Sequence, residues 1–218
     1  MSVSLVSHST PTNSDFGKTL LDNVAYCARV SNPANQNNTA TSEKLVRYLI
    51  KNDHWSPLEM VSVCLEIQTT RDIARQILRH RSFSFQEFSQ RYAIANIGVN
   101  IREARLQDKN NRQNSIETDN NELQDEWEAR QREVIDKAKY AYNWALSKGI
   151  AKEQARAVLP EGNTMSRLYM NGTMRSWIHY IQLRSGNGTQ KEHKQIAIMC
   201  AKAIEHIFPM INEFITES

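Results

Sequence analysis

Residues 61–80 constrain the fold more than any other segment, because a strand pattern leads directly into a helix pattern there. In VSVCLEIQ, residues 61–68, every second side chain is aliphatic, which is the period of a strand with one buried face. In TRDIARQILRH, residues 70–80, the aliphatic side chains recur instead at the spacing of one helix face. The segment therefore predicts helices packed against a sheet.

Weaker patterns extend this picture along the chain. VSLVS at residues 3–7 and MSRLYM at residues 165–170 are consistent with two further strands. Helices are expected over residues 15–30, 42–53, about 122–148, 173–183 and 190–214, with a further short helix through Ala155. The first should begin at Asp15. The helix over about 122–148 has Trp127 and Val134 among its apolar positions and is followed by Gly149. The expected fold class is α+β.

Length and composition fit one globular unit. The chain has 218 residues, of which 40% are hydrophobic and 23% charged. That composition is ordinary for a globular protein, and that length suits one domain. We expect a single domain over residues 1–218, with a polar, turn-rich and mobile insertion near residues 107–121.

Cysteine and histidine spacing argues against a disulfide framework and against a metal site. Cys27, Cys64 and Cys200 stand far apart and form no CxxC pair, and the six histidines show neither HxxxH nor HExxH spacing. The first ten residues lack a basic region with a long apolar run, and no apolar stretch reaches about 18 residues. We therefore expect a cytoplasmic protein with no bound metal and no membrane segment.

Arginine is concentrated in one part of the chain. Between Arg71 and Arg105 there are seven arginines and no lysine. A guanidinium can bind phosphate or carboxylate through two parallel hydrogen bonds, which favours a site for such a group over a merely solvated helix face. Neither a G-x-G-x-x-G after a strand nor a P-loop occurs, so any nucleotide site must be built from side chains.

The segment RHRSFSFQEFSQRY, residues 79–92, combines cations or near-cations, serines and aromatic rings in what we expect to be an exposed turn after a helix. Guanidinium, hydroxyl and backbone N–H groups converging there can bind a phosphate. Its carboxylate, Glu87, would orient an arginine or accept from a sugar hydroxyl or a base N–H. The phenylalanines can stack on a flat ligand or anchor the core. Two functions stay open: binding of single-stranded nucleic acid, or binding of a mononucleotide or flavin in an enzyme pocket.

Polar residues at separated places favour the pocket over an extended groove. They occur in HWSPLE at residues 54–59, at Arg156, and at Arg175, His179 and Arg184. Arg175 and Arg184 are separated by about 900° of helix and so lie on opposite faces if the helix is straight. They can serve one site only if the helix ends early, and otherwise they serve sites in different subunits.

Residues 79–91 resemble the hallmark of the flavin-dependent thymidylate synthases, which is R-H-R, seven residues, S, one residue and R. Similarity to that family extends over most of the chain but not over the polar segment 107–121. It rests further on CARVSNP at 27–33, HWSPLE at 54–59, ARQILRHR at 74–81, EQARAVLP at 153–160 and MRSWIHYIQLRSGNGTQKE at 174–192.

This resemblance implies an enzyme that converts dUMP to dTMP. Methylenetetrahydrofolate would supply the carbon, and FAD reduced by NADPH would supply the hydride. The family fold has a central antiparallel sheet flanked by helices (α/β). It is assembled as a homotetramer in which several chains build each active site, and nucleic acid is not an expected partner.

The resemblance also implies residues for dUMP. Arg184 would be catalytic, because it would face the uracil ring and stabilise its N3-deprotonated form; a guanidinium is a permanent cation suited to that task. Ser89 has no evident adjacent base, which favours phosphate binding over a nucleophilic role. The residues that would hold dUMP, chiefly its phosphate, are Gln76, Arg79, Ser89, Arg91 and Arg156, and those along dUMP and the flavin edge are Glu87, Phe88 and Gln90.

For FAD, the resemblance implies a second set of residues. Two positions depart from the family pattern: His179 stands where many relatives have asparagine, and Gly188 where some have a histidine that contacts FAD. No cysteine lies in the arginine-rich region, which is consistent with hydride delivery in place of the cysteine nucleophile of the unrelated thymidylate synthases. The residues that would hold FAD are His54, Ser56, Arg79, His80, Arg81, Glu87, Thr173, Arg175 and His179, with His54 also on the folate side.

Overall fold

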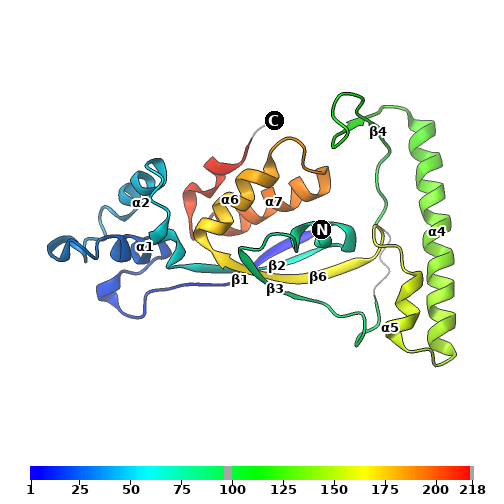
Figure 1. The fold of residues 1–218 in the computed structure, drawn as a ribbon, viewed down its shortest axis with the longest axis horizontal. Coiled ribbons are helices and arrows are strands. Elements are labelled where there is room, and N and C mark those ends of the chain that lie inside the picture. Colours follow the sequence, from blue (N-terminus) through cyan, green and yellow to red (C-terminus); the bar gives the residue numbers. More distant parts are fainter. Residues whose placement is uncertain (96–99, 217–218) are drawn as a thin grey trace.

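The computed structural model of the protein describes residues 1–95 and 100–216. Its centre is a four-stranded antiparallel sheet with the strand order β1-β2-β6-β3 (Figure 1). The expected α+β class with a central antiparallel sheet is thereby confirmed. The strands are β1 Ser2–His8, β2 Ser62–Thr70, β6 Met165–Thr173 and β3 Phe83–Glu87.

β2 is the strand that the alternating pattern predicts. Its side chains Val63, Leu65 and Ile67 are fully buried, whereas the residues between them are half-buried or exposed. β2 lies between β1 and β6, and its register with β6 runs from Ser62 opposite Thr173 to the far end of both strands. The end of β6 therefore lies beside the start of β2.

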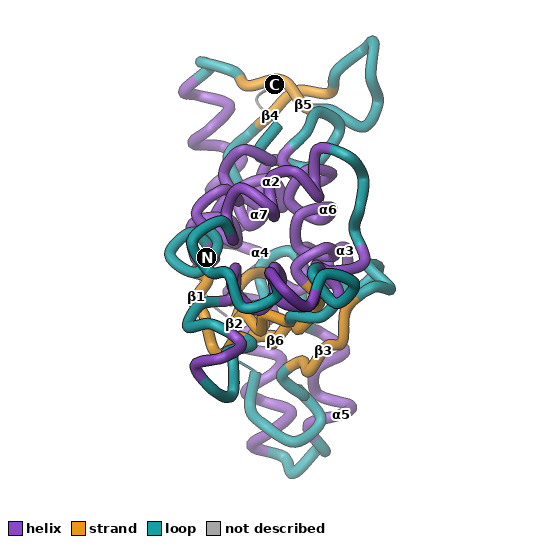
Figure 2. The backbone as a smooth tube through the Cα atoms, turned by 90° about the vertical axis from the view of Figure 1, so that its left-hand side faces the viewer, coloured by secondary structure: helices purple, strands orange, loops and turns teal. Residues whose placement is uncertain are grey.

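Helices α6 (Met174–Ser185) and α7 (Lys191–Ile204) lie together on one face of the sheet (Figures 1 and 2). The short helix α3 (Arg71–Ile77) contacts α7, β2 and β6. The core between these layers contains fully buried aromatic side chains, among them Trp177 and Tyr180 of α6. Such rings remove large apolar areas from water, so this layer holds the main stabilising contacts of the fold.

Helices α1 (Leu20–Ala28) and α2 (Ser42–Lys51) pack together at one end of the molecule (Figure 1). The expected start of α1 at Asp15 is wrong. The residues around Asp15 form a separate 3-10 turn that ends at Gly17, whose φ of 104° is incompatible with a helix. The helix begins after Thr19, whose side chain forms a capping box with the first turn.

Helices α4 (Asn121–Ser147) and α5 (Lys152–Ala155) lie at the opposite end (Figure 1). α4 ends just before Gly149, which has a φ of 75°, as expected for a glycine that follows a helix. Trp127 and Val134 of α4 are 43% and 51% exposed. The apolar pattern therefore marks the buried face of α4 only in part.

The polar segment around residues 107–121 contains a β-hairpin. Its strands are β4 (Arg105–Gln107) and β5 (Ser115–Glu117), which pair with each other in a separate two-stranded sheet. In the connecting turn, the carboxylate of Asp108 accepts from the backbone N–H groups of Asn110 and Asn111. The polar, turn-rich segment thus includes two short paired strands, and its mobility stays a prediction.

Residues 83–87, expected to belong to an exposed turn, form β3 at the edge of the sheet. The ring of Phe83 is buried and meets Trp177 edge-on at a centroid distance of 4.8 Å. Opposite Phe83 stands Gly172 of β6, where a Cβ would lie 2.6 Å from Phe83 Cε1. Glycine thus permits the close pairing of β3 with β6, and Phe83 anchors the core.

The helix expected over residues 190–214 is two elements. α7 ends at Ile204, and a 3-10 helix follows over Pro209–Phe214. Proline lacks the backbone N–H that a continuing helix requires. Within the described residues, no helix is both long enough and apolar enough to cross a membrane.

Candidate active site

Arg184 and His80 are 104 residues apart in the sequence and lie in direct contact. The Nε–H of Arg184, near the end of α6, donates to Nε2 of His80 at 2.8 Å. Burial, together with the charges of Arg184 and Arg79, lowers the pKa of His80 to about 4. His80 is therefore neutral near pH 7, carries its proton on Nδ1, and can accept this hydrogen bond.

The residues around His80 differ in exposure. Arg79 and Arg81, its two neighbours in the chain, are exposed to solvent, whereas Gln76 is half-buried. The amide of Gln76 donates to the side-chain oxygen of Gln190 at 2.7 Å. Exposed positive charge thus surrounds a neutral imidazole.

Glu87, at the end of β3, is held by two arginines of α3. Its carboxylate oxygens lie 3.8 Å from Arg71 and 3.4 Å from Arg75. The hydroxyl of Ser166 also donates to Glu87, at 2.7 Å. Glu87 is therefore paired with two arginines, and its predicted contacts with dUMP and FAD stay predictions.

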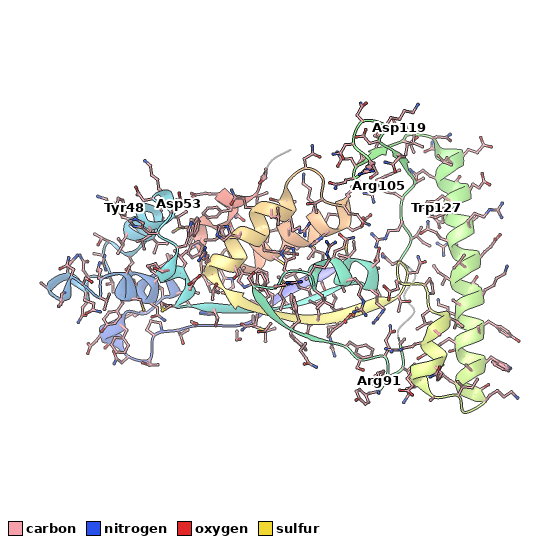
Figure 3. All side chains as sticks on the ribbon, viewed as in Figure 1. Tyr48, Asp53, Arg91, Arg105, Asp119 and Trp127 are labelled. Carbon is pink, nitrogen blue, oxygen red and sulfur yellow. The ribbon has the colours of Figure 1, made fainter. Side chains whose placement is uncertain are left out.

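A second group joins the chain after β3 to α5. Arg91 is exposed, lies beside α5 in Figure 3, and is 3.4 Å from the carboxylate of Glu153. Arg156 donates from Nε to the backbone carbonyl of the same Glu153 at 3.3 Å. Ser89 accepts from the backbone N–H of Arg91, and Gln90 is 3% exposed with an Nε2 that has no partner among the described residues. Four predicted dUMP-binding residues are thus brought together.

A third group lies where the 3-10 helix η3 (Ser56–Glu59) meets the start of α6. Arg175 forms an ion pair with Glu59 at 2.6 Å, and the ring of His179 packs on Trp55 at a centroid distance of 4.7 Å. Partial burial and the charge of Arg175 lower the pKa of His179. The predicted FAD-binding residues in this region are His54, Ser56, Thr173, Arg175 and His179.

The predicted residues do not converge on one point within the chain. The group around η3 lies at the Thr173 end of β6, whereas the backbone N–H of Phe88 donates to the carbonyl of Arg167, near the other end. That distance corresponds to roughly 20 Å of strand. Arg175 and Arg184 also face different partners, because α6 is continuous through both.

Comparison with known proteins identifies the family. The chain matches the family described as thymidylate synthase complementing protein over residues 18–210. A probable flavin-dependent thymidylate synthase of Paramecium bursaria Chlorella virus 1 is 49% identical over 188 residues, which cover 86% of this chain and 87% of that relative. The flavin-dependent thymidylate synthase of Synechocystis sp. is 50% identical over 188 residues, 86% of either chain. This chain belongs to the flavin-dependent thymidylate synthase family.

Solved structures similar to this chain include a nucleotide methylase. The UMP/dUMP methylase PolB from Streptomyces cacaoi, bound with 5-Br UMP, has a TM-score of 0.81 at 25% identity and covers 98% of this chain and 92% of its own. The same protein bound with 5-Br dUMP has a TM-score of 0.79 at 27% identity. The alternative of a single-stranded nucleic-acid-binding protein has no support from these comparisons.

The side chains at these places fit an anionic nucleotide and a flavin. Arg79 and Arg81 offer exposed guanidiniums, and Arg184 keeps both terminal nitrogens outside its bond to His80. The buried Nε2 of Gln90, which has no partner within residues 1–95 and 100–216, is a donor whose desolvation requires an acceptor. These groups are the donors that phosphate and pyrimidine oxygens require.

Sequence reasoning missed a buried ionic cluster beside this site. Arg102 and Arg105 were counted among the seven arginines without a role, and they lie 2.9 and 2.7 Å from the carboxylate of Glu192 on α7. The next residue, His193, is fully buried. Because 87 residues separate Arg105 from Glu192, no local pattern could have connected them.

A cavity of about 900 Å³ adjoins the predicted residues at Gln190, which lines the cavity and accepts from Gln76. Its walls are the β4–β5 hairpin, the start of α4 and the turn between α6 and α7. Arg105 and Trp127 mark two of these walls in Figure 3. Among the described residues that line this cavity there is none that the sequence assigned to dUMP or FAD.

Proposed function

We propose that this protein makes dTMP from dUMP by reductive methylation. Methylenetetrahydrofolate supplies the carbon, and FAD reduced by NADPH supplies the hydride. The proposal is supported above all by the contact of Arg184 with a neutral His80, beside exposed arginines, in a chain 50% identical to a flavin-dependent thymidylate synthase.

Arg184 is the proposed catalytic residue. The bond from its Nε–H to His80 fixes the plane of the guanidinium and leaves the two terminal nitrogens outside that bond, where they would face the uracil ring. A permanent cation at that place stabilises the N3-deprotonated ring and so raises the electron density at C5. The neutral His80 adds no competing positive charge.

The phosphate of dUMP is proposed to bind where the chain after β3 meets α5. Arg91 pairs with the carboxylate of Glu153 and Arg156 donates to the backbone carbonyl of the same residue, so the two guanidiniums lie close to each other. The Ser89 hydroxyl and the buried Nε2 of Gln90 add uncharged donors. The remaining proposed dUMP contacts are Gln76, Arg79, Glu87, Phe88 and Arg184.

FAD is proposed to bind along the group at η3 and the residues around His80. When bound, it supplies the hydride that completes the new methyl group. His179 and Trp55 present an aromatic surface there, and the exposed Arg79 and Arg81 offer charge for its phosphates. The full proposed set is His54, Ser56, Arg79, His80, Arg81, Glu87, Thr173, Arg175 and His179.

We infer that a homotetramer completes these sites. The proposed groups lie at opposite ends of β6, so residues from another chain would close the gap in each site. α4 also exposes Tyr140 to 75% and Trp144 to 51%, and large exposed apolar side chains are typical of subunit contacts. Light scattering should give four times the mass of one chain.

The test is reconstitution. Protein loaded with FAD should absorb near about 450 nm, respond to added dUMP in that band, and form dTMP when methylenetetrahydrofolate and NADPH are present. Arg184→Ala should abolish dTMP formation while NADPH oxidation stays measurable, and Arg132→Ala on the exposed face of α4 should change neither. A wild-type protein that binds no flavin and makes no dTMP would refute the proposal, and full dTMP synthesis by Arg184→Ala would remove that residue from the catalytic role. Salt-sensitive binding to oligonucleotides tighter than binding to dUMP would favour the nucleic-acid alternative.

A further inference from the structure

A chain of hydrogen bonds runs from α7 to α3 and back, and we call it the Gln76 relay. Nε2 of Gln190 donates to Oε2 of Glu192 at 2.9 Å, and Nε2 of Gln76 donates to Oε1 of Gln190 at 2.7 Å. Oε1 of Gln76 lies 3.2 Å from Nδ1 of His193, whose Nε2 lies 3.1 Å from the hydroxyl of Tyr180. His193 and Tyr180 are at most 1% exposed, so water does not compete for these bonds.

The carboxylate of Glu192 sets the direction of the relay. It lies 2.9 Å from Arg102 and 2.7 Å from Arg105. Burial alone would raise the pKa of Glu192, but the hydrogen bond from Arg105 and the charge of Arg102 bring it down to about 2. An ionised carboxylate can only accept, so Gln190 must turn its NH₂ toward Glu192 and its carbonyl oxygen toward Gln76.

The orientation of the Gln190 amide fixes the direction of every later hydrogen bond in the relay. Facing a carbonyl, Gln76 must point its NH₂ at Gln190, and its own carbonyl then faces His193. His193 must therefore carry its proton on Nδ1, leaving Nε2 to accept from Tyr180. Burial and the charge of Arg184 lower the pKa of His193 to about 3, so this ring stays neutral.

We propose that Gln190 and Glu192 are positioning residues that fix which end of the Gln76 amide faces the substrate. The proposal rests on the proposed function, in which Gln76 binds dUMP. With the relay intact, the second N–H of Gln76 is available to an anionic oxygen of dUMP. A flipped amide would present its carbonyl there and repel the same oxygen.

The first experiment is a double-mutant cycle on dUMP affinity, measured by titration into FAD-loaded protein. Gln190→Leu should weaken dUMP binding about 10-fold, the size expected when one charge-assisted hydrogen bond is lost. In a Gln76→Leu background the same change should have less than about a 2-fold effect, because Gln190 acts through Gln76. Gln195→Leu, an exposed glutamine on the same helix, is the matched control and should bind dUMP normally. Equal weakening by Gln190→Leu in both backgrounds, or none in either, would overturn the proposal.

The second experiment needs no ligand. Nitrogen-15 NMR of the imidazoles should show His193 protonated on Nδ1 in the wild type and in Gln195→Leu, with its signals assigned by their loss in His193→Gln. Gln190→Leu should shift His193 toward a mixture of tautomers while FAD content is retained. Wild-type His193 protonated on Nε2 would overturn the relay. If the wild type binds no dUMP, the proposed function fails, and this spectrum alone then decides whether the relay exists.

Discussion

Replacing Gly172 by alanine is expected to destabilise the fold. The added Cβ would lie 2.6 Å from Cε1 of Phe83 and closer still to Cδ1. Phe83 cannot swing away, because its ring is packed against Trp177 at 4.8 Å and Tyr180 at 5.9 Å between centroids. Forcing an extra methyl group into such a core costs about 1–3 kcal/mol. For a chain of this length each kcal/mol lowers the melting temperature by about 2–4 °C, so the clash should lower it by about 2–12 °C.

The matched control is Gly162→Ala. A Cβ on Gly162 would meet nothing within 4 Å, and its φ is not in the left-handed region. Both substitutions reduce the entropy of the unfolded chain to a similar extent, so the difference between the two melting curves isolates the clash. Shortening the neighbour by Phe83→Leu should remove most of the cost of Gly172→Ala. The contact between Gly172 and Phe83 does not set the pairing of β3 with β6 if Gly172→Ala and Gly162→Ala have the same melting temperature. The same conclusion follows if Gly172→Ala is as destabilising in the Phe83→Leu background as in the wild type.

The remaining predictions concern charge. The free energy of unfolding should fall as the pH drops from about 6.5 toward 4, because the folded-state pKa is about 4 for His80 and about 3 for His193, so the unfolded chain binds protons first. In urea denaturation at several pH values, His80→Gln should flatten this pH dependence, and an unchanged profile would contradict the prediction. Glu192→Gln should cost about 1–3 kcal/mol in urea denaturation, because Arg102 and Arg105 lose the buried carboxylate they share and keep the carboxylates of Asp72 at 3.0 Å and Glu103 at 3.5 Å. Glu126→Gln in an exposed ion pair should change little, and equal losses would refute the argument. Arg184→Lys should lose dTMP synthesis at normal flavin content, because an ammonium cannot hold His80 and still present a planar pair of N–H groups; retained product formation would show that charge alone suffices.

The sequence predicted the elements whose two faces differ in burial. β2 is such an element, because Val63, Leu65 and Ile67 enter the core while the residues between them do not. β3 was mistaken for a turn because its strand character depends on a partner. Phe83 and Gly172 must meet for β3 to pair with β6, and neither residue reveals the other in a local window. Periodicity reports burial, and burial of a short edge strand is decided by the rest of the fold.

At the site, the sequence likewise predicted which charged residue types are present but not the protonation state of each. In the sequence, His80 between two arginines belongs with the cations. In the structure, those neighbours and burial keep it neutral, and its neutrality is what lets it accept from Arg184. Glu192 has the same kind of role, because arginines keep its carboxylate ionised and it then fixes the amide of Gln190. In both places arginines set the protonation state of an acceptor, and that acceptor orients a side chain proposed to bind substrate or to act on it. A substitution that keeps the positive charge but moves it should therefore disturb orientation before it disturbs affinity for an anion.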